Sequence, residues 1–245
     1  MIRTQRLEKR YGRFQALHPL DLHVRSGEIF GFLGPNGAGK TTTIRLLAGV
    51  LPPSSGRIWM DGVDLLAEPE KARRRVGFIP DRPYLHEKLT GVEFLEFVAG
   101  VYGLDRTEAR RRIGSLLEEY ELSGFADALV EGYSHGMKQR LVLCATLLHE
   151  PRVLVVDEPM VGLDPRGARQ VKDVFRQLGA EGRAIFLSTH SLDVAEEVCD
   201  RIAIIHHGRL VALGTVDELR RHVASGAADL EAVFLKIVGD SPEVS

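Results

Sequence analysis

The fold is decided by the stretch Gly34-Pro35-Asn36-Gly37-Ala38-Gly39-Lys40-Thr41. It follows the phosphate-loop pattern, in which two glycines are separated by four residues and followed by Lys and then Ser or Thr. A short apolar run, Glu28 to Leu33, precedes the loop, and a helical pattern from Lys40 to Val50 follows it. Ordinary residue frequencies would produce the pattern in on the order of one per cent of chains this long. The stretch therefore predicts a phosphate site between a strand and a helix.

Each part of this loop has a physical reason to bind phosphate. Its glycines let the backbone turn tightly so that N–H groups face the phosphates, and the following helix adds the positive end of its dipole. Lys40 is expected to bridge the β- and γ-phosphates of a nucleotide, Thr41 to give its hydroxyl to Mg²⁺, and Thr42 to reach the α-phosphate. The loop alone does not separate kinases, GTPases, motors and transporter ATPases.

A second apolar strand, Val153 to Val156, is followed by two acids, Asp157 and Glu158. Open α/β sheets bind ligands at the carboxyl ends of their strands. We expect Asp157 to hold Mg²⁺, directly or through water, and Glu158 to orient and polarise the attacking water as a general base. The alternative is a solvated strand end. At the end of the next strand, His190 is placed to hydrogen-bond the γ-phosphate and the water, although a lone histidine is more often structural.

Strand and helix patterns alternate along most of the chain. Strands are expected at Ala16 to Val24, Glu28 to Leu33, Arg57 to Met60, Val76 to Pro80, Val153 to Val156, Ala184 to Leu187 and Ile202 to Ile205, and helices at Lys40 to Val50, Arg166 to Leu178 and Leu192 to Cys199. This alternation implies a largely parallel sheet. From Leu89 to Leu148 the pattern is helical, with Phe94, Phe97, Val98 and Val101 on one predicted face. A last helix, Asp229 to Val238, is predicted to dock on the body of the protein.

The composition excludes several classes of protein. The 245 residues include 34 acidic and 32 basic side chains, a net charge of −2, so there is no basic excess for nucleic acid. Met1 to Arg10 is too charged for a signal peptide, and the longest apolar run, Leu141 to Leu148, is too short to cross a bilayer. A cytosolic chain is expected, with Cys144 and Cys199 as buried free thiols.

From about Leu7 onward, the residues resemble the ATP-binding cassette family. Tyr11 is similar to the aromatic residue on which adenine stacks, with strand packing as the alternative. Tyr133-Ser134-His135-Gly136-Met137-Lys138-Gln139 resembles the signature loop, which in this family completes the ATP site of the opposite subunit. Tyr133, His135 and Met137 depart from the commonest form, Leu-Ser-Gly-Gly-Gln. Ser134 and Gly136 are present, so Ser134 is expected to cap a helix and face a γ-phosphate across a dimer.

Two further stretches belong to this resemblance. Val161-Gly162-Leu163-Asp164 is similar to the loop that communicates across the dimer, with Asp164 as the hydrogen-bonding residue or as a cap for the next helix. Gly77-Phe78-Ile79-Pro80-Asp81 carries Asp81 where the family usually has Gln, the residue that links Mg²⁺ and water to the membrane subunit. A carboxylate is able to bind Mg²⁺, but it adds negative charge beside the phosphates, so the coordination role of Asp81 stays open.

The resemblance implies an α/β fold: a P-loop NTPase (RecA-like) core with a mostly parallel sheet, an N-terminal antiparallel β subdomain and an inserted α-helical subdomain. One domain, 1–245, is expected, with 1–84 and 150–225 as the β and RecA-like parts, 85–149 as the helical insert and 226–245 as a C-terminal helix and tail. The implied cofactors are ATP and Mg²⁺. The implied partners are a second ATPase subunit, as a homodimer, and separate transmembrane permease subunits at the cytoplasmic face of the cell membrane.

The function implied is ATP hydrolysis that energises a transporter through head-to-tail dimerisation. The segments Asp81 to Leu85, Leu89 to Gly91 and Leu230 to Leu235 look most like cassettes of two-component exporters, in which Arg82 to Phe97 would border the groove for a membrane-subunit helix. A cassette protein of translation, DNA repair or cofactor assembly is the alternative, although the chain has one cassette and no long coiled-coil insertion.

Two other classes of nucleotide-binding protein are alternatives to an ATPase. A nucleotide-gated scaffold without turnover is favoured by Asp81 and the altered signature loop, and is opposed by Glu158 and His190. A GTPase would need the motif Asn-Lys-x-Asp, whereas the only asparagine, Asn36, lies inside the phosphate loop.

Overall fold

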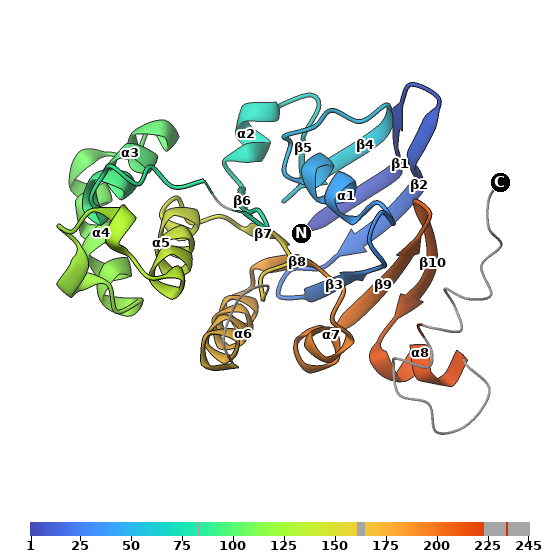
Figure 1. Cartoon of the computed structure of the whole chain (residues 1–245). Coiled ribbons are helices and arrows are strands. Elements are labelled where there is room, and N and C mark those ends of the chain that lie inside the picture. Colours follow the sequence, from blue (N-terminus) through green and yellow to red (C-terminus); the bar gives the residue numbers. More distant parts are fainter. Residues whose placement is uncertain (83, 161–164, 223–233, 235–245) are drawn as a thin grey trace.

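Two β-sheets and a separate group of helices make up the protein (Figure 1). The structure, a computed structural model, describes residues 1–82, 84–160, 165–222 and 234. The predicted loop 161–164 lies outside these residues, as does the predicted terminal helix apart from Phe234. No helix in the described part of the chain is long and apolar enough to cross a membrane.

The smaller sheet is antiparallel and has the strand order β2-β1-β4-β5. Its strands are β1 (Ile2–Tyr11), β2 (Phe14–Val24), β4 (Ser55–Met60) and β5 (Val63–Asp64). The residue pattern alone does not predict β1, because its apolar side chains are spaced among many charged ones. The pairing of β1 with both β2 and β4 nevertheless buries Ile2 and Leu7 in the core.

The larger sheet has the order β10-β9-β3-β8-β7-β6, in which every pair but β9 and β10 is parallel. Its strands are β3 (Ile29–Leu33), β6 (Val76–Ile79), β7 (Val153–Asp157), β8 (Ala184–Thr189), β9 (Arg201–His206) and β10 (Arg209–Gly214). Every residue of β3, β7 and β8 is buried, as expected for parallel strands covered on both faces. The predicted mostly parallel sheet is confirmed.

Helices cover both faces of the larger sheet and form the insert at the left of Figure 1. Around the sheets lie α1 (Lys40–Leu47), α2 (Pro69–Arg73), α6 (Pro165–Ala180), α7 (Leu192–Val198) and α8 (Val216–His222). The insert contains α3 (Gly91–Tyr102), α4 (Arg106–Glu119), the short 3₁₀ helices η1 (Ser123–Phe125) and η2 (Val130–Gly132), and α5 (His135–Leu147).

The buried face of α3 differs from the predicted one. Phe94 is buried, but the side chains of Phe97 and Val101 are 51% and 68% exposed. Leu95 and Ala99 are buried instead. Val98 is partly buried against the same core, so the buried face overlaps the predicted one only in part. Packing against α4 and α5 decides which side of α3 is buried, and spacing alone does not show this. Part of the apolar surface of α3 is therefore left open.

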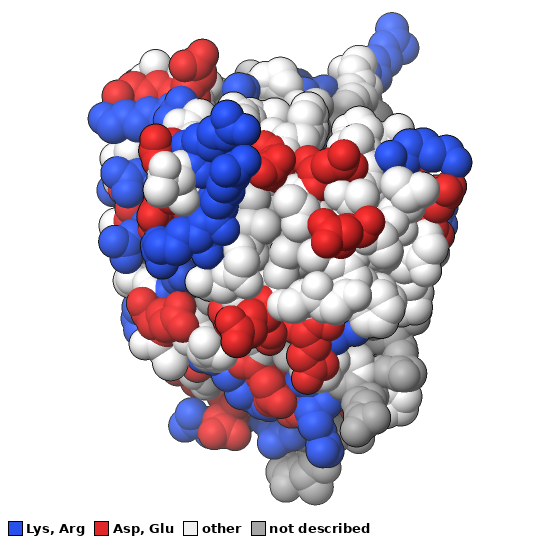
Figure 2. Space-filling view, turned by 90° about the vertical axis from the view of Figure 1, so that its left-hand side faces the viewer, with Lys and Arg blue, Asp and Glu red and all other residues white. Residues whose placement is uncertain are grey.

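Charged side chains of both signs gather along the left and lower parts of the face shown in Figure 2, beside a broad area without charge. Some lie beside one another because they form ion pairs along α4, where Glu108 contacts Arg111 at 2.6 Å and Arg112 at 2.7 Å. Such exposed pairs contribute little to folding free energy, so the insert depends on its apolar core for stability.

The two cysteines test how closely the core is packed. Cys144 and Cys199 are both free and buried, and burial raises the pKa of each thiol to about 12. Because the thiolate is the reactive form, we expect neither to react with a thiol reagent at pH 8 in the native protein. Both should react at once in urea. Rapid labelling of the native chain, followed by mass spectrometry, would contradict this packing.

Candidate functional site

The phosphate loop joins β3 to α1, and its shape is imposed by the neighbouring hairpin of β9 and β10. Gly37 and Gly39 have φ angles of 80° and 105°, which L residues with side chains rarely adopt. A Cβ atom on Gly34 would lie 2.4 Å from the carbonyl oxygen of Ile205 in β9. The N–H of Gly208 donates to the carbonyl of Ala38 at 2.9 Å. One side of the loop thus packs against β9 and the turn between β9 and β10, and the other side faces outward.

The first turn of α1 offers unpaired donors beside this loop. Gly39, the residue before α1, makes no side-chain cap, and no acidic residue lies in the first turn. The N–H groups at a helix start have no partner within the helix, and the helix dipole adds positive potential there. The turn is therefore suited to an anion.

Lys40 is the buried cation of the site. Its Nζ donates to the carbonyl oxygens of Gly34 at 2.7 Å and Pro35 at 3.3 Å, and lies 3.6 Å from Oε1 of Glu158. Two of these partners are neutral carbonyls. A phosphate oxygen would be a stronger acceptor for an ammonium group, so the lysine is able to exchange its present partners for a bound phosphate.

Asp157 lies at the centre of an acidic cluster at the end of β7. Burial raises the pKa of Asp157, and the charges of Asp81 and Glu158 raise it further. Hydrogen bonds from the hydroxyls of Ser188 and Thr41 act in the opposite direction. Ser188 is fully buried in β8, directly opposite Asp157 in the sheet register. The cluster therefore holds more negative charge than its own neighbours compensate.

Glu158 turns away from the line of β7. Its φ angle is 48°, a region in which a residue other than glycine is strained. The N–H of Glu158 donates to both the carbonyl oxygen and the hydroxyl oxygen of Ser188, each at 3.2 Å. Its carboxylate then lies between Lys40 and His190, with Oε2 at 2.9 Å from Nδ1 of His190. The strained turn thus directs the acid toward the phosphate loop.

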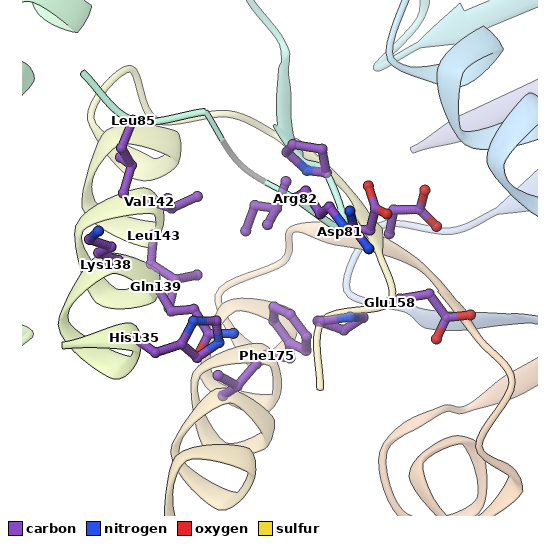
Figure 3. A pocket seen from close by; sticks show the side chains of 15 residues that line it. Asp81, Arg82, Leu85, His135, Lys138, Gln139, Val142, Leu143, Glu158 and Phe175 are labelled. Atoms are coloured by element: carbon purple, nitrogen blue, oxygen red, sulfur yellow. The ribbon is translucent and has the colours of Figure 1, made fainter. Parts of the chain in front are cut away.

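A cleft of about 270 Å³ separates these strand ends from α5 (Figure 3). His135, Gln139 and Leu143 of α5 face it from one side, and Asp81 and Glu158 lie on the other. The cleft therefore lies between the start of α5 and the acidic cluster at the strand ends.

The structure brings most of the predicted site residues together. The loop residues 34–42, with Asp157, Glu158 and His190, lie around one sheet edge, and Asp81 is close enough to raise the pKa of Asp157. Ser188 was not assigned a role from sequence. Its place at the strand end, two residues before His190, is the signal that could have found it.

Three of the predicted residues, Tyr11, Ser134 and Gly136, lie away from this sheet edge. Tyr11 is exposed at the end of β1, with the Nζ of Lys9 at 5.3 Å from its ring centre. Ser134 and Gly136 lie at the start of α5, and Figure 1 shows this helix apart from α1. Asp164 lies outside the described residues.

The glycine-rich loop packs against β9 and the turn between β9 and β10, Lys40 is buried beside it, and the carboxylate of Glu158 lies next to that lysine. This fold and this site define a P-loop nucleoside triphosphatase. The family profile described as ABC transporter matches residues 17–161. Over 223 residues the chain is 42% identical to the daunorubicin resistance ATP-binding protein DrrA3 of Streptomyces coeruleorubidus, a match that covers 91% of this chain and 71% of that protein. The chain belongs to the ATP-binding subunits of ABC transporters.

Solved structures agree with this assignment. One, described as the ATP-binding subunit of an ABC transporter, has a TM-score of 0.89 and 35% identity, and covers 97% of this chain and 99% of its own. Another, the dimeric structure of MJ0796, a bacterial ABC transporter cassette, has a TM-score of 0.79 and 25% identity, and covers 88% and 98% of the two chains.

Replacing Asp157 by Asn tests the electrostatic cost of this cluster. A raised pKa means that the folded state is favoured when Asp157 is protonated, and that stability falls as pH rises through the shifted pKa. The neutral Asn avoids this loss. Without nucleotide or metal, we therefore expect the variant to unfold at a higher urea concentration than wild type at pH 7.

This difference should shrink as the pH falls below the ordinary carboxyl range, where Asp157 is neutral in both states. Asp127→Asn, at an exposed position, is the matched control. A variant that is less stable than wild type at pH 7 would show that the carboxylate is not strained by its surroundings.

Proposed function

We propose that this chain is the Mg²⁺-dependent ATPase subunit of an exporter, and that two copies close head to tail on ATP. The observation that carries the proposal is the contact of Glu158 with both Lys40 and His190, at 3.6 Å and 2.9 Å. This arrangement places a base and an imidazole next to the lysine that would hold the γ-phosphate. A nucleotide-binding scaffold without turnover has no need of it.

The phosphate loop would bind the nucleotide, and Glu158 and His190 would act on the attacking water. The backbone N–H groups of the loop and of α1 bind the β- and α-phosphates, with Thr42 at the α-phosphate. Lys40 leaves its carbonyl partners to bind the β- and γ-phosphates. Glu158 accepts a proton from the attacking water, and His190 hydrogen-bonds the γ-phosphate and holds that water in line.

The acidic cluster fits a magnesium ion. Thr41 and Asp157 supply the hard oxygen donors that Mg²⁺ prefers, and the uncompensated charge around Asp157 would be lowered by a dication. When bound, the ion neutralises charge that develops on the phosphate oxygens. The described residues hold no group of three metal-ligating side chains around one point, so phosphate and water oxygens would complete the shell.

The position of Asp81 in this cluster favours contact with the ion through water over a direct bond. Its side chain is exposed at the end of β6, near enough to act on Asp157 through its charge. We propose that Asp81 contacts the ion through water. A direct bond would bring a further full negative charge to the phosphates.

The start of α5 has the geometry to complete a partner's site. The hydroxyl of Ser134 accepts the N–H of Met137 at 3.3 Å as a helix cap. A Cβ atom on Gly136 would meet no heavy atom within 4 Å, so the helix start is open to an incoming group. The dimeric MJ0796 structure supports such an assembly for this chain. Asp164 would then act at the dimer boundary, and Tyr11 would stack on adenine through its exposed ring.

A second hollow, of about 290 Å³, fits a segment of a membrane subunit. It lies between β6 and the insert and is lined by Phe78, Pro80, Tyr84, Phe94, Val98, Tyr102, Val142, Ala145, Thr146 and His149. Tyr84 of this lining is 81% exposed, and the neighbouring side chain of Phe97 is exposed on α3. Exposed aromatic side chains around a hollow are typical of a protein interface. The resistance function of the DrrA3 relative favours outward transport.

Glu158→Gln tests the assigned base. The amide keeps the shape of the side chain but cannot accept the proton of water, so we expect ATP turnover to fall at least a hundredfold while ATP binding is kept. The variant should also accumulate as an ATP-bound dimer in size-exclusion chromatography. Turnover equal to that of wild type would remove Glu158 from the mechanism. Glu181→Gln, on an exposed side chain beyond α6, is the control.

Ser134→Arg tests action in trans. The larger cation would fill the open start of α5 and displace a facing nucleotide, so dimerisation should be lost in the Glu158→Gln background. ATP affinity of the monomer, measured by calorimetry, should be unchanged because Ser134 caps α5, a helix that lies apart from α1 in the same chain (Figure 1). Loss of ATP binding by the monomer would place Ser134 in its own site instead.

A further inference from the structure

We propose that Tyr133 is a positioning residue, and that its hydroxyl anchors the start of α5 to Phe125 of η1, beside the first residue of α3. The inference rests on the proposed function, because the atom it positions is the hydroxyl of Ser134. It concerns a residue that departs from the commonest signature loop, where leucine stands at this position. A leucine side chain has no hydroxyl and could not form the contact described below.

The anchor is a partly buried hydrogen bond beside a glycine that leaves room for the tyrosine. Tyr133 is buried, and its hydroxyl donates to the carbonyl oxygen of Phe125 at 2.7 Å. Gly91, the first residue of α3, leaves the room that the tyrosine needs. A Cβ atom on Gly91 would lie 2.4 Å from the tyrosine hydroxyl oxygen, closer than packed atoms approach. A side chain at position 91 therefore does not fit beside the tyrosine hydroxyl in this arrangement.

A backbone ladder joins the same two segments. The N–H of Val130 donates to Leu89 at 2.9 Å, and the N–H of Val92 donates to the carbonyl of Ala126 at 3.0 Å. On one side of this ladder, Lys138 of α5 contacts Glu87 at 2.5 Å. Residues 87–92 and 125–133 therefore move as one body with the start of α3.

Ser134 is the next residue along the chain from the anchor. The N–H of Tyr133 donates to the carbonyl of Val130 at 3.1 Å, so both the backbone and the side chain of Tyr133 are fixed. Only one peptide unit then separates a fixed ring from the serine that caps α5. A shift of α3, for example when a partner presses on Phe97, would reach Ser134 through this short connection.

The test uses Tyr133→Phe and Gly91→Ala, singly and together, in the Glu158→Gln background. Removing the hydroxyl keeps the ring in the core but frees its end, so fewer molecules hold Ser134 in the binding position. We expect the ATP-bound dimer to weaken roughly tenfold or more by analytical ultracentrifugation, since each of two subunits loses a partly buried hydrogen bond. ATP affinity of the monomer should not change.

Gly91→Ala should produce the same defect by pushing the hydroxyl away. The double variant should lose much less than the sum of the two single losses, because the 2.4 Å clash disappears with the hydroxyl and only contacts of 3.3 Å with the carbonyl oxygen of Ala126 and 3.4 Å with the tyrosine ring remain. This non-additivity is specific to the proposed contact. In the active Glu158 background, Tyr133→Phe should lower kcat more than it changes KM. Tyr120→Phe removes a hydroxyl from another buried tyrosine of the insert and is the control.

Two results would overturn the inference. One is a Tyr133→Phe protein that dimerises like wild type, and the other is additive loss in the double variant, which would indicate general destabilisation. Ser134→Arg separates this failure from failure of the proposed function. If Ser134→Arg dimerises normally, the shared site itself is wrong; if only Tyr133→Phe is normal, the shared site stands and the anchor falls.

Discussion

The whole site depends on the parallel register of three buried strands. Leu33 of β3 pairs with Thr189 of β8, and Ser188 pairs with Asp157 of β7. All three strands therefore end at one level, and the chain that follows each must leave the sheet at the same edge. A shift of one residue in this register would turn each side chain to the opposite face and separate Glu158 from Lys40.

This shared edge concentrates groups that do not stabilise one another. A buried carboxylate at Asp157, a strained backbone at Glu158 and a lysine held by carbonyl oxygens each cost folding free energy in the absence of a ligand. The buried apolar strands β3, β7 and β8 offset that cost. A bound magnesium triphosphate would compensate the charges of Asp157 and Lys40, so we expect the nucleotide to stabilise the folded protein.

The sequence was sufficient where function lies in contiguous residues. The phosphate loop and the acid pair after β7 were predictable because each follows a buried strand. Residues joined only by tertiary contacts were not: nothing local to Ser188 indicates that it bridges Asp157 and Glu158. The buried side of α3 was not fully predictable from spacing, because contacts with α4 and α5 decide which side chains are buried. Strand β1 was not predicted, because pairing with β2 and β4, not its composition, buries its apolar side chains. Roles for Asp164 and Asp81 stay predictions.

We propose that two chains share each nucleotide: Lys40 and Glu158 of one chain and Ser134 of the other contact the same triphosphate. A structure of the Glu158→Gln protein with MgATP tests it most directly. We expect the hydroxyl of Ser134 to lie within hydrogen-bond distance, about 3 Å, of a γ-phosphate oxygen that is bound by Lys40 of the second copy. A nucleotide-bound structure in which Ser134 is remote from every phosphate oxygen would contradict it.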